Sequence, residues 1–211
     1  MSHLTFEQGT DAWRSARAGR ATASRFADVM ATVKSGEAAD RRNYRAQLVC
    51  EALTGKPMDA FATPAMRTGI EREPIARARY EAETGVIVER CGFFTIDGVR
   101  AGASPDGLIG VDGVLEIKCP NAATHIDYLR LPAGKPPRAY VWQIQGEMLA
   151  TGRAWCDFVS YHPDFPEPLQ LTIRRVLRDD DAIARLVDEL KRFIADVDAE
   201  VSELQALATS I

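Results

Sequence analysis

The sequence has no long apolar run, no closely spaced cysteines and no excess of positive charge. No apolar stretch approaches the roughly 20 residues that a membrane span needs, so we expect no membrane partner. The N-terminal residues MSHLTFEQGTDAWRSAR lack the basic-then-apolar order of a signal peptide, which predicts a cytoplasmic protein. The four cysteines form no C-x-x-C motif and are typical of reduced, buried thiols.

The charge is unevenly distributed along the chain. A net charge of −4 argues against a general nucleic-acid binder, because contact with phosphates needs cations. Residues 12–46 nevertheless contain eight Arg or Lys against three acids, whereas residues 178–211 contain four bases against nine acids. Such a polarised chain can present one basic surface to a polyanion. The alternative is that these arginines only solvate helix faces.

The chain shows no internal repeat and no low-complexity linker, and its length predicts one domain over residues 1–211. Apolar periodicity and capping residues predict helices in the segments 22–33, 40–55, 63–85, 136–152 and 179–207. β-Branched and aromatic residues between turn residues predict strands in the segments 86–96, 100–103, 107–111, 114–119, 155–162 and 169–176. This order predicts an α/β fold with a mixed central sheet flanked by helices, a helical N-terminal part and a long C-terminal helix.

The stretch GASPDGLIGVDGVLEIKCP, residues 102–120, interrupts an apolar run with two opposite charges. Because side chains alternate along a strand, Glu116 and Lys118 share one face and the apolar residues between them take the other. A hairpin would bring Asp106 alongside Glu116. The pattern therefore predicts two carboxylates and an ammonium close together.

Two adjacent carboxylates favour a bound divalent cation, because their negative charges repel each other. Mg²⁺ would use one or two carboxylates, a backbone carbonyl and water. A lysine beside it could orient or help deprotonate the bound water, or neutralise charge on a phosphoryl group. By spacing alone, a surface ion pair is the more common interpretation of such a pattern.

The sequence contains a second copy of each half of this pattern, at a different spacing. Pro163 and Asp164 form another P-D pair, and Glu189 and Lys191 form another E-x-K. That E-x-K lies in the predicted C-terminal helix, where residues two apart point in roughly opposite directions. Strand context is what distinguishes the first match.

Four ordered blocks resemble the phage lambda exonuclease and YqaJ-type recombinase nucleases of the PD-(D/E)xK superfamily. SPDGL followed by LEIKCP is similar to the S-P-D-G-L and E-[LI]-K-C-P motifs of that family. EQGTDAWRSARAGRATAS, GIEREPIARARYEAETG and AYVWQIQGEML resemble its N-terminal block, its glutamate-bearing helix and its Q-x-Q helix. The similarity spans residues 7–161 and implies a PD-(D/E)xK nuclease core.

The resemblance implies a metal-dependent active site. Asp106 and Glu116 would be metal ligands, joined by the carbonyl of Ile117. Glu73 matches an additional acidic ligand; Glu71 is a nearby competitor, and a mere helix-start charge is the alternative for Glu73. The implied cofactor is Mg²⁺, with Mn²⁺ as an alternative, at two ions per site.

The resemblance also assigns catalytic roles. Lys118 would act on the nucleophilic water, beside the carboxylates of Asp106 and Glu116. Gln143 matches the glutamine that supports this lysine or water, for which an amide is suited. The alternative for Gln143 is an exposed helix residue.

The N-terminal block implies a pocket for the terminal 5′-phosphate of a DNA end, formed by Arg17, Ser24 and Ser104. Arginine offers a bidentate fork, and Ser24 lies at the start of a predicted helix, where free N–H groups favour an anion. Ser24 could equally be only an N-cap. Lys34 matches a basic residue that touches the duplex. Met66 matches an apolar wedge that parts the terminal base pair, with a core methionine as the alternative.

The sequence departs from the family pattern after the K-C-P motif. A family arginine is here Thr124, with His125 next to it and Arg130 further on. A basic contact to the phosphate pocket is therefore lost or supplied by another residue. The segment 132–137, PAGKPP, also differs and is expected to form a loop between helices.

The resemblance implies an alkaline-type 5′→3′ exonuclease that degrades one strand of linear double-stranded DNA from a 5′-phosphorylated end. Its products would be mononucleotides and a 3′ overhang for recombination. The implied partners are two further copies in a toroidal homotrimer and a single-strand annealing recombinase, in a phage- or prophage-encoded system of a bacterial host. The alternatives are a RecB-like single-strand or structure-specific nuclease, a restriction-type endonuclease, or an inactive module that binds DNA ends.

Overall fold

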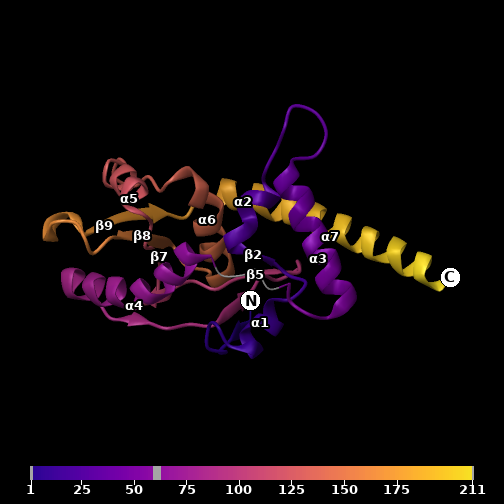
Figure 1. Ribbon diagram of the computed structural model, residues 1–211, viewed down its shortest axis with the longest axis horizontal. Coiled ribbons are helices and arrows are strands. Elements are labelled where there is room, and N and C mark those ends of the chain that lie inside the picture. Colours follow the sequence, from indigo (N-terminus) through magenta and orange to yellow (C-terminus); the bar gives the residue numbers. More distant parts are fainter. Residues whose placement is uncertain (1, 59–62, 211) are drawn as a thin grey trace.

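The chain folds into two β-sheets with helices packed around them, and the computed structural model describes residues 2–58 and 63–210 (Figure 1). The helices are α1 (Asp11–Arg17), α2 (Phe26–Val29), α3 (Ala39–Thr54), α4 (Pro64–Thr84), α5 (Ala122–Leu129), α6 (Val141–Thr151) and α7 (Asp180–Thr209). Short 3₁₀ turns are η1 (Ala23–Arg25), η2 (Arg138–Tyr140) and η3 (Glu167–Leu169). The strands are β1 (His3–Leu4), β2 (Ala21–Thr22), β3 (Val88–Glu89), β4 (Phe93–Thr95), β5 (Ala101–Ala103), β6 (Gly107–Ile109), β7 (Gly113–Lys118), β8 (Trp155–Tyr161) and β9 (Leu171–Leu177).

The larger sheet has the strand order β3-β6-β7-β8-β9. β6 and β7 form an antiparallel hairpin, and its turn begins at Gly110, whose φ of 51° suits a residue without a β-carbon. β7 and β8 run parallel, with α5 and α6 in the connection between them. β7 is therefore the central strand of a mixed sheet.

Helices cover both faces of β7. Leu115 and Ile117 lie in one buried cluster with Tyr80 of α4. Val114 lies in another buried cluster with Ile144 of α6. Figure 1 shows α4 on one side of this sheet and α6 on the other. The alternation predicted from the sequence is confirmed, because each set of side chains meets a different helix.

The smaller sheet, in the order β1-β4-β5-β2, contributes to a separate core with α2, α3 and α7. Tyr44 of α3 and Leu190 and Phe193 of α7 are fully buried in this core. α7 begins at the N-cap Asp179, whose side chain accepts a hydrogen bond from the N–H of Ala182. Its C-terminal part extends past α3, away from the larger sheet (Figure 1).

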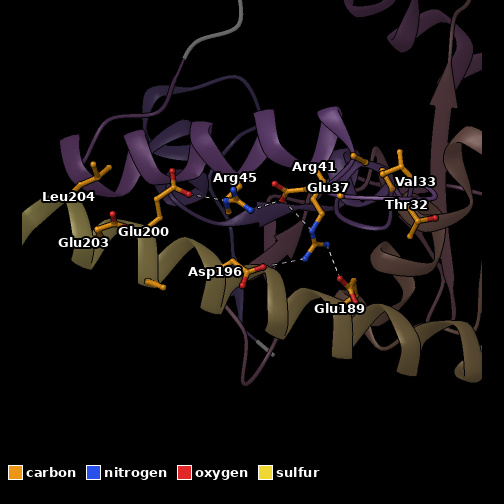
Figure 2. Close-up of a pocket in the computed structure, with 14 residues that line it drawn as sticks. Thr32, Val33, Glu37, Arg41, Arg45, Glu189, Asp196, Glu200, Glu203 and Leu204 are labelled. Atoms are coloured by element: carbon orange, nitrogen blue, oxygen red, sulfur yellow. Dashed lines mark hydrogen bonds and ion pairs between the residues drawn. The ribbon is translucent and has the colours of Figure 1, made fainter.

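The basic N-terminal segment and the acidic C-terminal helix neutralise each other in part. Arg41 of α3 pairs with Glu189 at 2.8 Å and with Asp196 at 3.5 Å, and Arg45 pairs with Glu200 at 2.9 Å. Figure 2 shows both arginines pointing from α3 toward α7. Arg41 and Arg45 already have carboxylate partners. The uneven charge of the sequence therefore does not create a basic, polyanion-binding surface where α3 meets α7.

Two of the expected elements are wrong. The segment 86–96 is not one strand, because it divides into β3 and β4, which belong to different sheets. A β-carbon at Gly92 would overlap the carbonyl oxygen of Leu4. The backbone of β1 therefore packs directly against the backbone at Gly92, between β3 and β4. The helix expected over residues 22–33 is reduced to η1 and the four residues of α2, because Thr22 ends β2.

The remaining predicted helices and strands are confirmed to within a few residues. Pro74 lies inside α4 without ending it, and residues 132–137 lie between α5 and η2 as expected. Within the described residues, no helix combines the length and the apolar composition that crossing a bilayer would require.

Candidate active site

Asp106 lies opposite Glu116 across the β6–β7 hairpin. The hairpin pairs Gly107 with Leu115, which places the adjoining residues of the two strands side by side. The backbone N–H of Asp106 donates to the carbonyl of Leu115 at 3.1 Å, and the N–H of Ile117 donates to Asp106 Oδ2 at 2.6 Å. The backbone of β7 therefore holds the carboxylate of Asp106 beside that of Glu116.

Lys118 lies on the same face of β7 as Glu116 and forms an ion pair with Glu116 Oε1. The Nζ of Lys118 is also 5.0 Å from the centroid of the Tyr140 ring, an arrangement that favours a cation. Burial lowers the pKa of Lys118, but the charges of Glu116 and Asp106 outweigh burial and bring this pKa above its ordinary value. Lys118 is therefore an ammonium group that donates hydrogen bonds.

Gln143 of α6 connects Glu116 to a third carboxyl group, that of Glu147. The Nε2 of Gln143 donates to Glu116 Oε1 at 2.6 Å and to Glu147 Oε1 at 2.9 Å. Gln143 is 9% exposed and Glu147 is 1% exposed. Gln143 is thus not the exposed helix residue that the sequence left open.

The carboxyl groups of this row are crowded and largely withdrawn from water. Burial, followed by the charge of Glu116, raises the pKa of Asp106 well above its usual range. Burial and the charge of Glu116 likewise raise the pKa of Glu147. These carboxyl groups therefore resist full ionisation, and a bound divalent cation would favour their charged forms.

The oxygen donors of the site fit a hard divalent cation. Glu73 of α4 lines the same cleft as Asp106, whereas Glu71 is exposed and is not among its lining residues. Glu73 is paired with Arg77 at 2.6 Å, and within the described residues no three Asp, Glu, His or Cys side chains converge as a complete metal site. Asp106 and Glu116 are therefore adjacent, and the charge of Glu73, which Arg77 holds through Oε1, also acts on Asp106.

A cleft of about 970 Å³ leads to Asp106. Its lining includes Arg17, Ser24, Met66 and Glu73. Met66 is 48% exposed, which rules out the core methionine that the sequence left open. The cleft therefore brings five of the sequence-predicted residues to one cavity, although they come from α1, η1, α4 and the turn before β6.

One indole ring joins Arg17 to Ser104. The guanidinium carbon of Arg17 lies 3.9 Å from the centroid of the Trp13 ring, and Trp13 Nε1–H donates to Ser104 Oγ at 2.8 Å. Burial lowers the pKa of Arg17, while Tyr44 and Glu51 act in the opposite direction. Arg17 forms no direct ion pair with any residue that the structure describes, so its guanidinium remains available to an anion.

Residues 12–154 match the family model of the YqaJ-like viral recombinase domain. The chain belongs to this family. No curated protein matches it. Among solved structures it is similar to an alkaline exonuclease, LHK-Exo, from Laribacter hongkongensis, with 45% identity, a TM-score of 0.87, and coverage of 95% of this chain and 99% of that chain. A structure of LHK-Exo in complex with dAMP matches at 46% identity with the same TM-score and coverage.

A phage related exonuclease from Haemophilus somnus 129PT is 12% identical, with a TM-score of 0.69 and coverage of 90% of this chain and 96% of that chain. At this identity the likeness shows the fold alone. The PD-(D/E)xK core expected from the sequence is confirmed. Together, the comparisons support a nuclease of the exonuclease kind within the YqaJ-like family.

In this YqaJ-like chain, two residues predicted to bind DNA have surroundings that the sequence did not predict. Ser24 lies within η1 and not at the start of a long helix, and the N-cap of η1 is Thr22, which makes no side-chain capping bond. Lys34 is exposed between α2 and α3 and is not among the residues lining the cleft. Lys34 is therefore separate from the Arg17 site within one chain.

His125 is not the replacement for the arginine that the family carries after K-C-P. The ring is fully buried, with Nδ1 2.7 Å from Ser160 Oγ and Nε2 2.8 Å from the carbonyl of Leu169. A carbonyl can only accept, so Nε2 carries the proton and Nδ1 accepts from the serine. Both ring nitrogens are thus used inside the fold. Thr124 donates its N–H to the Asn121 cap of α5.

Sequence reasoning missed three residues that position the site. Gln8 Nε2 donates to the carbonyl of Pro105 at 2.7 Å and to that of Cys91 at 3.1 Å, which steadies the turn before Asp106. Trp13 joins Arg17 to Ser104. Gln8 and Trp13 fall within the N-terminal block that resembles the family, although no role was predicted for either. Glu147 also has a sequence signal, since a glutamate four residues after Gln143 faces the same side of a helix.

Proposed function

We propose that the protein is a metal-dependent 5′→3′ exonuclease that hydrolyses linear double-stranded DNA from 5′-phosphorylated ends. It releases mononucleotides and leaves a 3′ single-stranded overhang. The observation that carries the proposal is the placement of Asp106, Glu116 and Lys118 together on one hairpin, with Asp106 at a cleft that Arg17 also lines. Membership of the YqaJ-like family and the likeness to LHK-Exo support it.

The metal ligands in this proposal are Asp106, Glu116 and the carbonyl of Ile117, with Glu73 as an additional ligand. Mg²⁺ is the proposed ion, with Mn²⁺ as a substitute and two ions per site, because the donors are all oxygen atoms. When bound, such ions supply a more acidic water and stabilise charge on the phosphoryl oxygens. Lys118 holds the attacking water or a phosphoryl oxygen by hydrogen bonds from its ammonium group.

The terminal 5′-phosphate binds at Arg17, Ser24 and Ser104. The Arg17 guanidinium, stacked on Trp13, offers two parallel N–H donors to a phosphate, and the serine hydroxyls donate single hydrogen bonds. Met66 stands exposed in the same cleft, where an apolar side chain can separate the last base pair. The dAMP bound to LHK-Exo supports a mononucleotide as the product.

The oligomer and the partner follow from family resemblance. We propose a ring-shaped homotrimer through which the duplex passes and a single-strand annealing recombinase that receives the 3′ overhang. In a ring, the positive charge of a net-acidic chain need only line the channel, and we propose that Lys34 touches the duplex there. Light scattering at low and high salt tests the trimer, and a monomer at both salts contradicts it.

Digestion of linear duplex DNA labelled at either the 5′ or the 3′ end tests the activity and its polarity together. With Mg²⁺, the 5′ label should be released first as a mononucleotide, and a chelator should stop the release. A supercoiled circular plasmid should stay intact. Early release of the 3′ label contradicts the proposed polarity.

The same assay separates the other candidates. Cleavage of the circular plasmid would identify a restriction-type endonuclease. Faster digestion of single strands than of duplex would identify a RecB-like nuclease. Binding of DNA ends without digestion in either metal would identify an inactive end-binding module.

A further inference from the structure

Glu147 of α6 is a buried carboxyl group that none of the roles above requires. It is 1% exposed, and its Oε2 has no hydrogen-bond partner among the described residues. Gln143 donates to its Oε1 at 2.9 Å, and the carboxyl groups of Glu147 and Glu116 also lie within hydrogen-bonding reach of each other. A carboxyl oxygen that is buried and unpaired destabilises a folded protein. If the side chain at this position only filled the core, an apolar residue would give a more stable fold. The carboxyl group therefore needs another explanation.

The geometry of Gln143 provides that explanation. An amide nitrogen carries two hydrogens, and Gln143 Nε2 uses one on Glu116 at 2.6 Å and the other on Glu147 at 2.9 Å. Two carboxylates therefore specify which end of the amide faces Glu116. If only Glu116 bound the amide, the side chain would keep more rotational freedom, because one hydrogen bond limits orientation less than two.

The resulting row of contacts runs from the cleft into the interior. Lys118 pairs with Glu116 Oε1, and the same oxygen accepts a hydrogen bond from Gln143. Gln143 also donates a hydrogen bond to Glu147. Gln143 and Glu147 are four residues apart on α6 and so lie on the same side of that helix. Glu147 is the buried end of this row and shares its helix with the side chain it orients.

We propose that Glu147 is a positioning residue, which holds the Gln143 amide so that Glu116 and Lys118 keep the orientation needed for hydrolysis. The inference rests on the proposed nuclease function and extends its site by one residue. Supporting residues of this kind typically change metal affinity or activity by 10–100-fold when they are replaced.

The test compares E147M, which keeps the length of the side chain but removes the acceptor, with E147Q, which restores an acceptor oxygen. For E147M we expect kcat on 5′-phosphorylated linear duplex to fall about 10–100-fold, with KM for DNA ends unchanged within about twofold. E147Q should recover most of that loss. Calorimetric titration with Mg²⁺ should show weaker binding in E147M than in E147Q, which gives a readout independent of turnover.

A double-mutant cycle with Gln143 tests the route of the effect. If Glu147 acts through Gln143, then Q143L and Q143L/E147M should have the same kcat, because the second change has nothing left to orient. Equal additional losses of kcat from E147M in both backgrounds would overturn the proposal. Q145M is the matched control on the same helix, since Gln145 is buried and, among residues 2–58 and 63–210, bonds only the carbonyl of Leu177 and the N–H of Asp179. It should lower the melting temperature without changing the kcat of the folded enzyme.

Each remaining outcome decides the question. If E147M lacks a cooperative unfolding transition, E147A replaces it, and failure of both to fold assigns Glu147 to folding alone and overturns the proposal. Wild-type kcat and Mg²⁺ affinity in a folded E147M also overturn it. A wild-type protein that digests no DNA refutes the proposed function instead, while a normal wild type with an unaffected E147M refutes only the role of Glu147.

Discussion

Lys118 and Glu116 form an ion pair on one face of β7, and the same carboxylate faces Asp106 across the hairpin. Lys118→Ala would leave these two carboxylates without their ammonium partner. It would also remove the donor that we assign to the water or the phosphoryl oxygen. We expect kcat on linear duplex to fall about 10²–10³-fold, the range for losing one donor aimed at developing charge. Steady-state digestion of 5′-labelled duplex measures it.

Lys191→Ala is the matched control for this change. Lys191 belongs to the second E-x-K of the sequence, which lies on α7, and Glu189 in that motif pairs with Arg41 and Arg192. K191A should digest DNA at the wild-type rate. Equal rates in wild type and K118A would remove Lys118 from the mechanism.

Arg17 should affect the rate of digestion only when the 5′ end of the DNA carries a phosphate. Its guanidinium is stacked on Trp13 and faces the cleft, so Arg17→Ala removes charge-assisted hydrogen bonds to that group. Such bonds contribute about 1.5–3 kcal/mol, so kcat/KM on 5′-phosphorylated ends should fall about 10–100-fold. On 5′-hydroxyl ends, R17A and wild type should be similar. Initial rates on the two substrates measure this, and R42A, at an exposed arginine of α3, is the control. An equal loss on both kinds of end would argue against a phosphate contact.

Local patterns in the sequence predicted the strand that carries the site. Alternation along β7 placed Glu116 and Lys118 on one face, because the period of a strand depends only on neighbouring residues. The short hairpin then predicted that Asp106 lies beside Glu116, and the register of β6 and β7 agrees.

Contacts between distant segments were beyond sequence reasoning. Trp13 and Ser104 are 91 residues apart, and their hydrogen bond depends on how β5 and α1 pack. The pairing of Arg45 with Glu200 spans 155 residues, and it neutralises one of the arginines of the basic N-terminal segment. Neither contact leaves a periodic signal, because each depends on a tertiary arrangement and not on spacing along one element.

Gly146→Ala should destabilise the fold and disturb the site together. Gly146 lies on α6 between Gln143 and Glu147, and a β-carbon there would overlap the ring of Phe26. Overpacking of this kind costs about 1–3 kcal/mol, which exceeds the gain of up to about 1 kcal/mol from replacing a helical glycine. Urea unfolding should show a lower free energy of unfolding, and kcat should fall with it. G69A, on α4 with open space around its β-carbon, should instead stabilise the protein by about 0.4–1 kcal/mol.

The buried ring of His162 should make the fold sensitive to mild acid. Burial and then the charge of Arg72 lower the pKa of His162 below its ordinary value, while Asp164 acts in the opposite direction and His125 adds to the lowering. A lowered pKa means that the unfolded chain takes up the proton first as the pH falls below about 6.5, so the folded state loses stability through this window. The slope from one such group is at most about 1.4 kcal/mol per pH unit.

Urea unfolding between pH 7.5 and 5 measures the effect of His162. His162→Asn keeps an acceptor for the N–H of Asp164, which His162 Nδ1 accepts at 3.3 Å, but it cannot titrate in this range. Its free energy of unfolding should therefore fall less steeply on acidification than that of wild type. Asp164→Asn removes the one neighbour that raises the pKa of His162, so this variant should lose stability over a wider range of pH. Parallel curves for wild type and H162N would show that this histidine does not control the acid response.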